Sequence, residues 1–277
     1  MRTPGLGVLR PALAGLVVLA GGCIDSETVV TVRRDGSGTV RVREYFSPQL
    51  TGMLQGIGGA MGGGGGEAPA AGDALDRVVR EAVEARARQM GPEVERVELT
   101  RGRNAAEWDG YEATFRFADV NRLSVAPPES SRGGDAGPAP AAKGYRFAMK
   151  DGQLSVRIPD EGRPDGAPPS GAPPDVPAAP ALADPMAAVM ASMMRGLHVR
   201  IAVRVEGRIV ETNAIQADAG EGTVVLLDLP VDRIFDKPEL TQAMMTRKAE
   251  LPALLRKAGI EGVVVEEPGK DVTIRFE

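Results

Sequence analysis

Apolar and polar residues alternate along several short segments of the chain, and a period of two is typical of half-buried β-strands. Between 111 and 117 the odd positions are Tyr, Ala, Phe and Phe, while the even positions are Glu, Thr and Arg. The segment 199–206 alternates in a similar way. Two β-branched runs, 28–34 and 39–46, flank Asp-Gly-Ser-Gly and therefore predict a β-hairpin.

Other segments have the composition of strands. The runs 145–149 and 153–158 flank Lys-Asp-Gly, which predicts a second hairpin. Further strands are expected at 94–101, 208–212, 223–229, 262–267 and 271–276.

Two segments have the period of an amphipathic helix. In 73–90 the apolar residues share one face, Asp73 is a suitable N-cap, and Gly91-Pro92 is a stop signal. A second helical stretch starts at Glu239, is interrupted or restarts at Pro252, and ends at Gly259. Because the strands mostly form hairpins, we expect an α+β fold, with about two substantial helices packed on an antiparallel sheet.

The composition adds flexible insertions to this fold. The chain of 277 residues holds 35 Gly and 22 Pro. Many of them lie in three tracts, at 56–72, 126–142 and 159–182. Such tracts bury too little apolar surface to offset the entropy lost on ordering. We therefore expect one α+β domain over 28–277 that contains three flexible insertions.

The N-terminus has the features of a secretory signal peptide. Arg2 and Arg10 accompany an apolar stretch at 11–20, which is shorter than the roughly 20 residues of a spanning helix. Gly21 and Gly22 then precede Cys23, the one cysteine of the chain. This order resembles the lipobox of bacterial lipoproteins, which implies cleavage after residue 22 and acylation of Cys23 by chains such as palmitate. An ordinary signal peptide followed by an unmodified cysteine is the alternative.

Acylation would make the membrane the first partner of the protein. Several acyl chains on one residue anchor a protein stably, whereas a single chain binds only marginally. Residues 23–27 would form a tether, and the folded part would lie outside the cytoplasm in the bacterial cell envelope. Ile24 follows Cys23 and Asp25 comes one position later, so the sequence leaves open whether the membrane is the inner or the outer one.

Charge and residue counts exclude several kinds of site. The net charge is −5, so nucleic acid is not an expected partner. One Cys and one His exclude the usual Cys- and His-based metal sites, and we expect no metal and no cofactor. His198 is expected at the surface, and 218–222 is expected to be a turn and not a calcium loop. Glu266 and Glu267 should point to opposite faces of a strand, so the two acids cannot act together on one bond. The sequence shows no catalytic constellation, and we expect no enzyme.

Two apolar segments, 48–61 and 184–197, have residues at helical spacing. The candidate contact residues in them are Leu50, Met53, Leu54, Ile57, Met186, Met190, Met193 and Met194. Methionine surfaces repack easily, so these segments are candidates for flaps that cover a lipid or engage a protein partner. Core packing and a disordered loop are the alternatives.

Two blocks of the chain also resemble a known family. The hairpin around Asp-Gly-Ser-Gly follows Cys23 closely, and 199–205 leads into Gly-Arg-Ile-Val-Glu-Thr-Asn-Ala at 207–214 and then into 223–229. Together with the lipobox, these blocks resemble bacterial envelope lipoproteins and, more distantly, the LppM-type lipoprotein domain. The resemblance implies a small α+β module that is likened to a lipid-binding fold, and it implies no catalytic residues.

We therefore expect a non-catalytic binding or scaffolding module at a membrane surface, with an envelope protein as a candidate partner. A carrier of a lipid or other apolar ligand that uses the two Met-rich segments is the alternative. A carboxylate-based hydrolase, which needs two acids about 5–10 Å apart in a cleft, is a third hypothesis.

The lipidation hypothesis has a direct test in Cys23→Ser. Without the thiol there is no acceptor for the acyl chains, so the variant should stay unprocessed and free of fatty acid. Mass spectrometry of the protein extracted from bacterial membranes measures both properties. Acylation of the variant would contradict the assignment.

Overall fold

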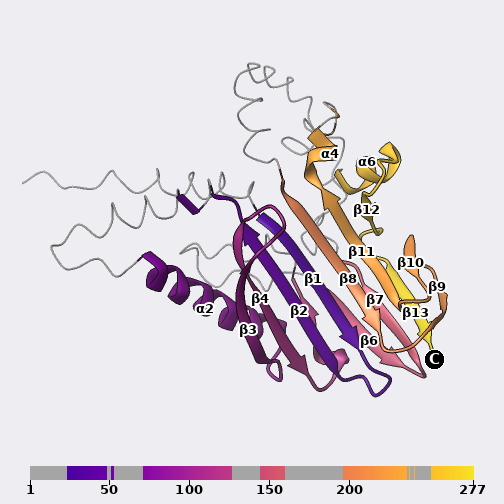
Figure 1. Ribbon diagram of the computed structural model, residues 1–277. Helices are drawn as coiled ribbons and strands as arrows, with labels where there is room; N and C mark the ends of the chain where they lie inside the picture. Colours follow the sequence, from indigo (N-terminus) through magenta and orange to yellow (C-terminus); the bar gives the residue numbers. More distant parts are fainter. Residues whose placement is uncertain are drawn as a thin grey trace, which may run out of the picture.

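The computed structural model describes residues 24–48, 51–52, 71–126, 144–159, 196–235, 237, 240 and 251–277 (Figure 1). The described residues form two sheets and a small number of helices, which confirms the α+β class. The three Gly/Pro-rich tracts lie almost wholly outside these residues.

The larger sheet has eight strands, in the order β10-β11-β8-β1-β2-β4-β3, with β12 paired to β11. Its strands are β1 (Ile24–Val32), β2 (Gly38–Phe46), β3 (Glu95–Arg103), β4 (Asp109–Phe117), β8 (His198–Val205), β10 (Gln216–Asp218), β11 (Thr223–Pro230) and β12 (Val264–Val265). The expected hairpin of β1 and β2 is present. Neighbouring strands are antiparallel except β1 and β8, which are parallel.

The smaller sheet has five strands in the order β5-β6-β7-β13-β9, and all of its pairs are antiparallel. Its strands are β5 (Ser124–Val125), β6 (Tyr145–Lys150), β7 (Gln153–Arg157), β9 (Ile209–Thr212) and β13 (Asp271–Phe276). β6 and β7 form the second expected hairpin. Asp151 and Gly152 between them have positive φ angles of 51° and 75°, as the tight Asp-Gly turn requires.

One long helix, α2 (Ala71–Met90), matches the expected helix at 73–90 and ends at Gly91. The short helices are η2 (Val120–Arg122), α4 (Val231–Phe235) and α6 (Leu251–Ala258). Pro252 lies in the first turn of α6, where a missing N–H costs nothing. Residues 241–250, which belong to the second expected helix, lie outside the described residues.

The main core lies on one face of the larger sheet. In β1 the even positions from Ser26 to Val32 are buried, while the odd positions are partly exposed. One cluster of buried apolar residues joins this inner face to α2 and to the smaller sheet. Figure 1 shows α2 beside β3 and β4, with the smaller sheet beside β8 and β11. The opposite face, called the outer face below, therefore presents the odd positions of β1.

The first strand begins earlier than the sequence pattern indicates. Residues 24–27, assigned above to a tether, form the first part of β1 and pair with both β2 and β8. Their side chains alternate like the rest of the strand, with Ser26 buried and Glu27 partly exposed. The hydrophobicity pattern misses the start of this strand because Asp25, Ser26 and Glu27 are polar.

A second, smaller cluster packs α4 and α6 against β11 and β12 through residues such as Ile234, Leu255 and Val265. None of the helices among the described residues is both long and apolar enough to cross a bilayer.

Two strand glycines give a matched test of packing. A Cβ added at Gly38 would lie 1.9 Å from the Thr31 carbonyl oxygen and 2.6 Å from the ring of Phe117, whereas one added at Gly102 would meet nothing within 4 Å. We expect Gly38→Ala to lower the free energy of unfolding by about 2–4 kcal/mol. Gly102→Ala should change it by less than about 0.5 kcal/mol. Urea unfolding of both variants measures this difference, and equal effects would contradict the packing described here.

Candidate functional site

The site residues expected from the sequence lie outside the described residues. They are Cys23, Leu50, Met53, Leu54, Ile57, Met186, Met190, Met193 and Met194. Their roles remain predictions. The described residues instead bring together a set of charged side chains that the sequence analysis did not identify.

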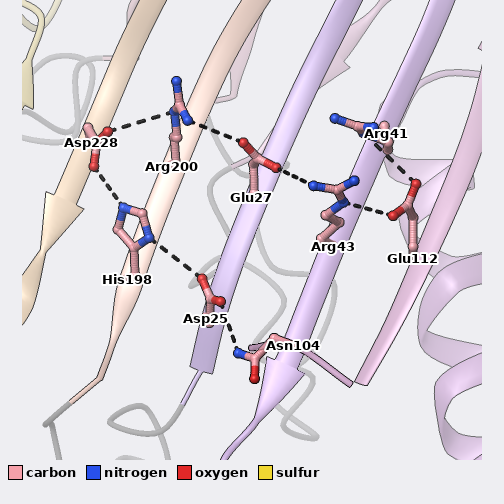
Figure 2. Close-up of polar contacts among 9 residues, drawn as sticks. All are labelled: Asp25, Glu27, Arg41, Arg43, Asn104, Glu112, His198, Arg200 and Asp228. Carbon is pink, nitrogen blue, oxygen red and sulfur yellow. Dashed lines mark hydrogen bonds and ion pairs between the residues drawn. The ribbon is translucent and has the colours of Figure 1, made fainter. Parts of the chain in front are cut away.

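Five charged residues of alternating sign cross the outer face in a single row (Figure 2). The row runs through β11, β8, β1, β2 and β4 and consists of Asp228, Arg200, Glu27, Arg43 and Glu112. We call it the charge ladder. Each residue is in register with the next, so every charge has opposite charges on the neighbouring strands.

The contacts of the ladder are strongest around Arg43. Its Nε donates to Glu112 Oε2 at 2.7 Å, and its Nη1 donates to Glu27 Oε2 at 3.3 Å. Arg200 continues the row, with Nη1 3.5 Å from Glu27 Oε1 and Nε 3.7 Å from Asp228 Oδ2. The hydrogen bond that Arg43 donates to Glu112 raises the pKa of Arg43. Half-exposed pairs of this kind contribute about 0.2–1 kcal/mol each, so the ladder mainly neutralises the face and stabilises the register.

His198 lies beside the ladder between two carboxylates (Figure 2). Its Nε2 is 2.8 Å from Asp228 Oδ1, and its Nδ1 is 3.6 Å from Asp25 Oδ1. The hydrogen bond to Asp228 and the neighbouring Asp25 carboxylate raise the pKa of His198 to about 9, and the contact with His198 lowers the pKa of Asp25. The imidazole is therefore protonated at neutral pH. A ring with both nitrogens protonated has no lone pair with which to accept a proton.

This geometry refines the expectation for His198. The side chain is at the surface, as expected, but only 40% exposed, and it has an acid on each side. Asp25 and Asp228 come from β1 and β11, and the sequence contains no signal that these strands flank β8.

Asn104 connects the β3–β4 loop to the start of β1. Its Nδ2 donates to Asp25 Oδ2 at 3.2 Å, and its Oδ1 accepts from the backbone N–H groups of Ala106 and Trp108, both at 3.0 Å. Trp108 packs on Gly196, just before β8, where an added Cβ would lie 2.6 Å from the indole ring. The loop is therefore held beside Asp25 and His198.

A polar network is buried on the inner face between α2 and the larger sheet. Arg86 of α2 is only 9% exposed and pairs with Glu44 of β2, whose other oxygen accepts from the Tyr111 hydroxyl at 2.6 Å. Arg86 also reaches Thr28 Oγ1 at 3.5 Å. Burial opposes the charge of Arg86, but the Glu44 carboxylate outweighs it and raises the pKa of Arg86. Burial also raises the pKa of Tyr111, and the Glu44 charge adds to this effect.

The other sequence candidates behave as ordinary structural elements. Asp218 Oδ1 accepts from the N–H groups of Gly220 and Glu221 at 2.9 and 3.0 Å, which is a polar turn as expected. Glu266 is buried and accepts from the Ile215 N–H at 2.7 Å, whereas Glu267 pairs with Lys270 at 2.6 Å. Within the described ranges no group of three His, Cys, Asp or Glu residues has the arrangement of a metal site.

The chain was compared with known proteins. No protein-family model matches it, and no curated protein matches it. Among solved structures it is similar to the NMR structure of the folded domain of LppM from Mycobacterium tuberculosis, with 10% sequence identity and a TM-score of 0.32. The similarity covers 92% of this chain and 91% of that domain.

Because the chain has one histidine, the protonation of His198 on the outer face can be measured without overlap from other imidazoles. In an unfolded chain a His pKa is about 6.5, and in the fold it is raised to about 9. The folded state therefore binds the proton more tightly. The resulting stability is complete below about pH 6.5 and is lost as the pH rises through 9. NMR titration of the one imidazole should give a pKa well above 6.5, and Asp228→Asn should lower it.

The effect on stability follows from the same shift. Because the side chain is 40% exposed, solvent reduces its contribution, and we expect the wild type to lose about 1–2 kcal/mol more than His198→Gln between pH 6.5 and 9.5. Urea unfolding at several pH values measures this loss. Parallel curves for the two proteins would contradict the Asp25–His198–Asp228 contact.

Proposed function

We propose that the protein is a non-catalytic binding or scaffolding module of the bacterial cell envelope, anchored to a membrane through acyl chains on Cys23. The observation that supports this most directly is the position of β1. It begins at Ile24, one residue after Cys23, and it lies between β8 and β2 inside the larger sheet. An acyl anchor on Cys23 would therefore attach to the middle of a packed sheet with almost no linker.

The start of β1 belongs to an edge formed by several strand ends. Ile24 pairs with Phe46 at the end of β2, Phe46 pairs with Asp109 at the start of β4, and Asp25 pairs with His198 at the start of β8. We call this the anchor edge. With the acyl chains inserted, this edge would face the bilayer and the rest of the sheet would extend away from it.

The β3–β4 loop adds an aromatic residue to the anchor edge. Trp108 directly precedes Asp109 in this loop and is partly exposed. Tryptophan is favoured at membrane–water interfaces because its ring is largely apolar while its N–H can still be hydrated. Its position suits an edge that rests on lipid headgroups. The outer face would then stay accessible to a protein partner.

A second candidate function is that of a carrier for a lipid or another apolar ligand. The chain enters the Met-rich segment 48–61 from the end of β2, and it leaves the segment 184–197 at the start of β8. Both segments are thus joined to the fold at the anchor edge, where a carrier would exchange apolar ligands with the membrane. This connection favours the carrier over the hydrolase hypothesis.

Trp108 is the one tryptophan of the chain, so its fluorescence tests the orientation. In vesicles that contain brominated phosphatidylcholine, the emission of the acylated protein should be quenched strongly. The emission of the non-acylated chain of residues 24–277 should not change. As a matched control, Arg34→Trp in a Trp108→Phe background places the probe at the β1–β2 turn. β1 has nine residues and spans about 30 Å, so that probe should escape quenching.

The outcomes separate the proposals. Equal quenching at both positions, or none at Trp108, would contradict an anchor edge that rests on the bilayer. Native mass spectrometry of residues 24–277 purified from bacterial extract tests the carrier. A reproducible added mass of lipid size supports it, and a clean apo mass counts against it.

A further inference from the structure

The outer face contains a hollow beyond the charge ladder, farther from the anchor edge. Its volume is about 190 Å³. The lining residues are Val29, Thr31, Thr39, Arg41, Thr114 and Arg204. They come from β8, β1, β2 and β4, and they include two arginines and no acid.

The strand register places the two arginines on opposite sides of β1. Arg204 of β8 is in register with Thr31, and Thr31 is in register with Thr39 of β2. Arg41 lies two residues further along β2, opposite Val29. Strands that flank a common neighbour are about 10 Å apart, so two long guanidinium side chains can contact one small ion between them.

These arginines differ from those of the ladder in their partners. Within the described part of the chain, no carboxylate pairs with Arg204. The nearest acid to Arg41 is Glu112, with 4.0 Å between Arg41 Nε and Glu112 Oε1. That carboxylate already accepts from Arg43 at 2.7 Å. Arg41 Nε is buried and has no hydrogen-bond partner, and the same holds for Nε of Arg200 in the ladder, which lies 3.7 Å from Asp228 Oδ2.

The hydroxyl groups around the hollow are also available. Among the described residues, the side chains of Thr31, Thr39 and Thr114 make no hydrogen bond to another protein group, so each can donate to a ligand. The hollow therefore combines two fixed positive charges with three neutral donors from three neighbouring strands.

We propose that this hollow binds a phosphate group. A phosphate carries about two negative charges and three or four oxygens in tetrahedral array, which matches two guanidinium groups and several hydroxyl donors around it. A carboxylate offers only two oxygens in one plane and would leave part of this donor set unused. The proposal depends on the described residues alone and holds whether or not Cys23 is acylated.

The phosphate has two chemical sources, a soluble phosphomonoester and a lipid headgroup. Thr31 lies seven residues after Ile24 on the same strand, which is about 24 Å along β1. A lipid headgroup in the membrane that contacts the anchor edge would have to reach along this length of β1 to enter the hollow. Soluble and vesicle-bound probes distinguish the two sources.

The soluble arm of the test uses isothermal titration calorimetry of the mature chain with inorganic phosphate and with glycerol 3-phosphate. Arg41→Gln and Arg204→Gln should each weaken binding about tenfold. The matched control, Arg146→Gln, removes an exposed arginine from β6 in the smaller sheet and should change affinity less than about twofold. Thr39→Val keeps the shape of the side chain but removes a donor, and should weaken binding about three- to tenfold.

The vesicle arm uses phosphatidic acid in phosphatidylcholine, against phosphatidylcholine alone, with the non-acylated chain of residues 24–277. Binding that requires phosphatidic acid and is lost in Arg204→Gln identifies a headgroup as the source. Binding of soluble phosphate with the same variant profile identifies a phosphomonoester. An equal loss in Arg146→Gln, unchanged binding by Arg41→Gln and Arg204→Gln variants that unfold like wild type, or no binding of the wild-type chain in either arm would overturn the proposal.

Discussion

The parallel pairing of β1 with β8 is the interaction on which the rest of the structure depends. It joins eight residue pairs, from Asp25 with His198 to Val32 with Val205. These residues are far apart in the chain, so the pairing closes a long loop, whose entropic cost the shared core must offset. On one side it brings together β8, β11 and β10, and on the other side β2, β4 and β3. Without it there would be no continuous inner face for α2 and the smaller sheet to cover.

Both faces of the larger sheet carry polar contacts. On the inner face, the buried Arg86–Glu44–Tyr111 network links α2 to the sheet. Removing one member of a buried ion pair leaves an uncompensated charge at a cost of about 3–5 kcal/mol. A one-residue shift of α2 would turn Arg86 away from Glu44 by about 100°. The network thus favours one placement of the helix, which apolar packing alone would specify less sharply.

On the outer face, three features follow one another along β1. The anchor edge comes first, the charge ladder follows, and the hollow lies farthest from Ile24. The ladder has paired charges, and its partners lie on adjacent strands, so it has little net field with which to attract an ion. In the hollow, Arg204 pairs with no carboxylate among the described residues, and Arg41 lies 4.0 Å from Glu112, which also accepts from Arg43. The two rows therefore differ in how closely their arginines are paired with acids.

The sequence by itself determined the local elements: the hairpins, the helix that stops before Gly91 and the signal-like N-terminus. These follow from side-chain period, turn residues and composition, which act over a few neighbouring positions. Only the tertiary structure decided that residues 24–27 belong to a central strand, that His198 is protonated between Asp25 and Asp228, and that Arg41 and Arg204 share a hollow. Each of these depends on which strands become neighbours, and strand neighbours are selected by burial and register across the whole chain.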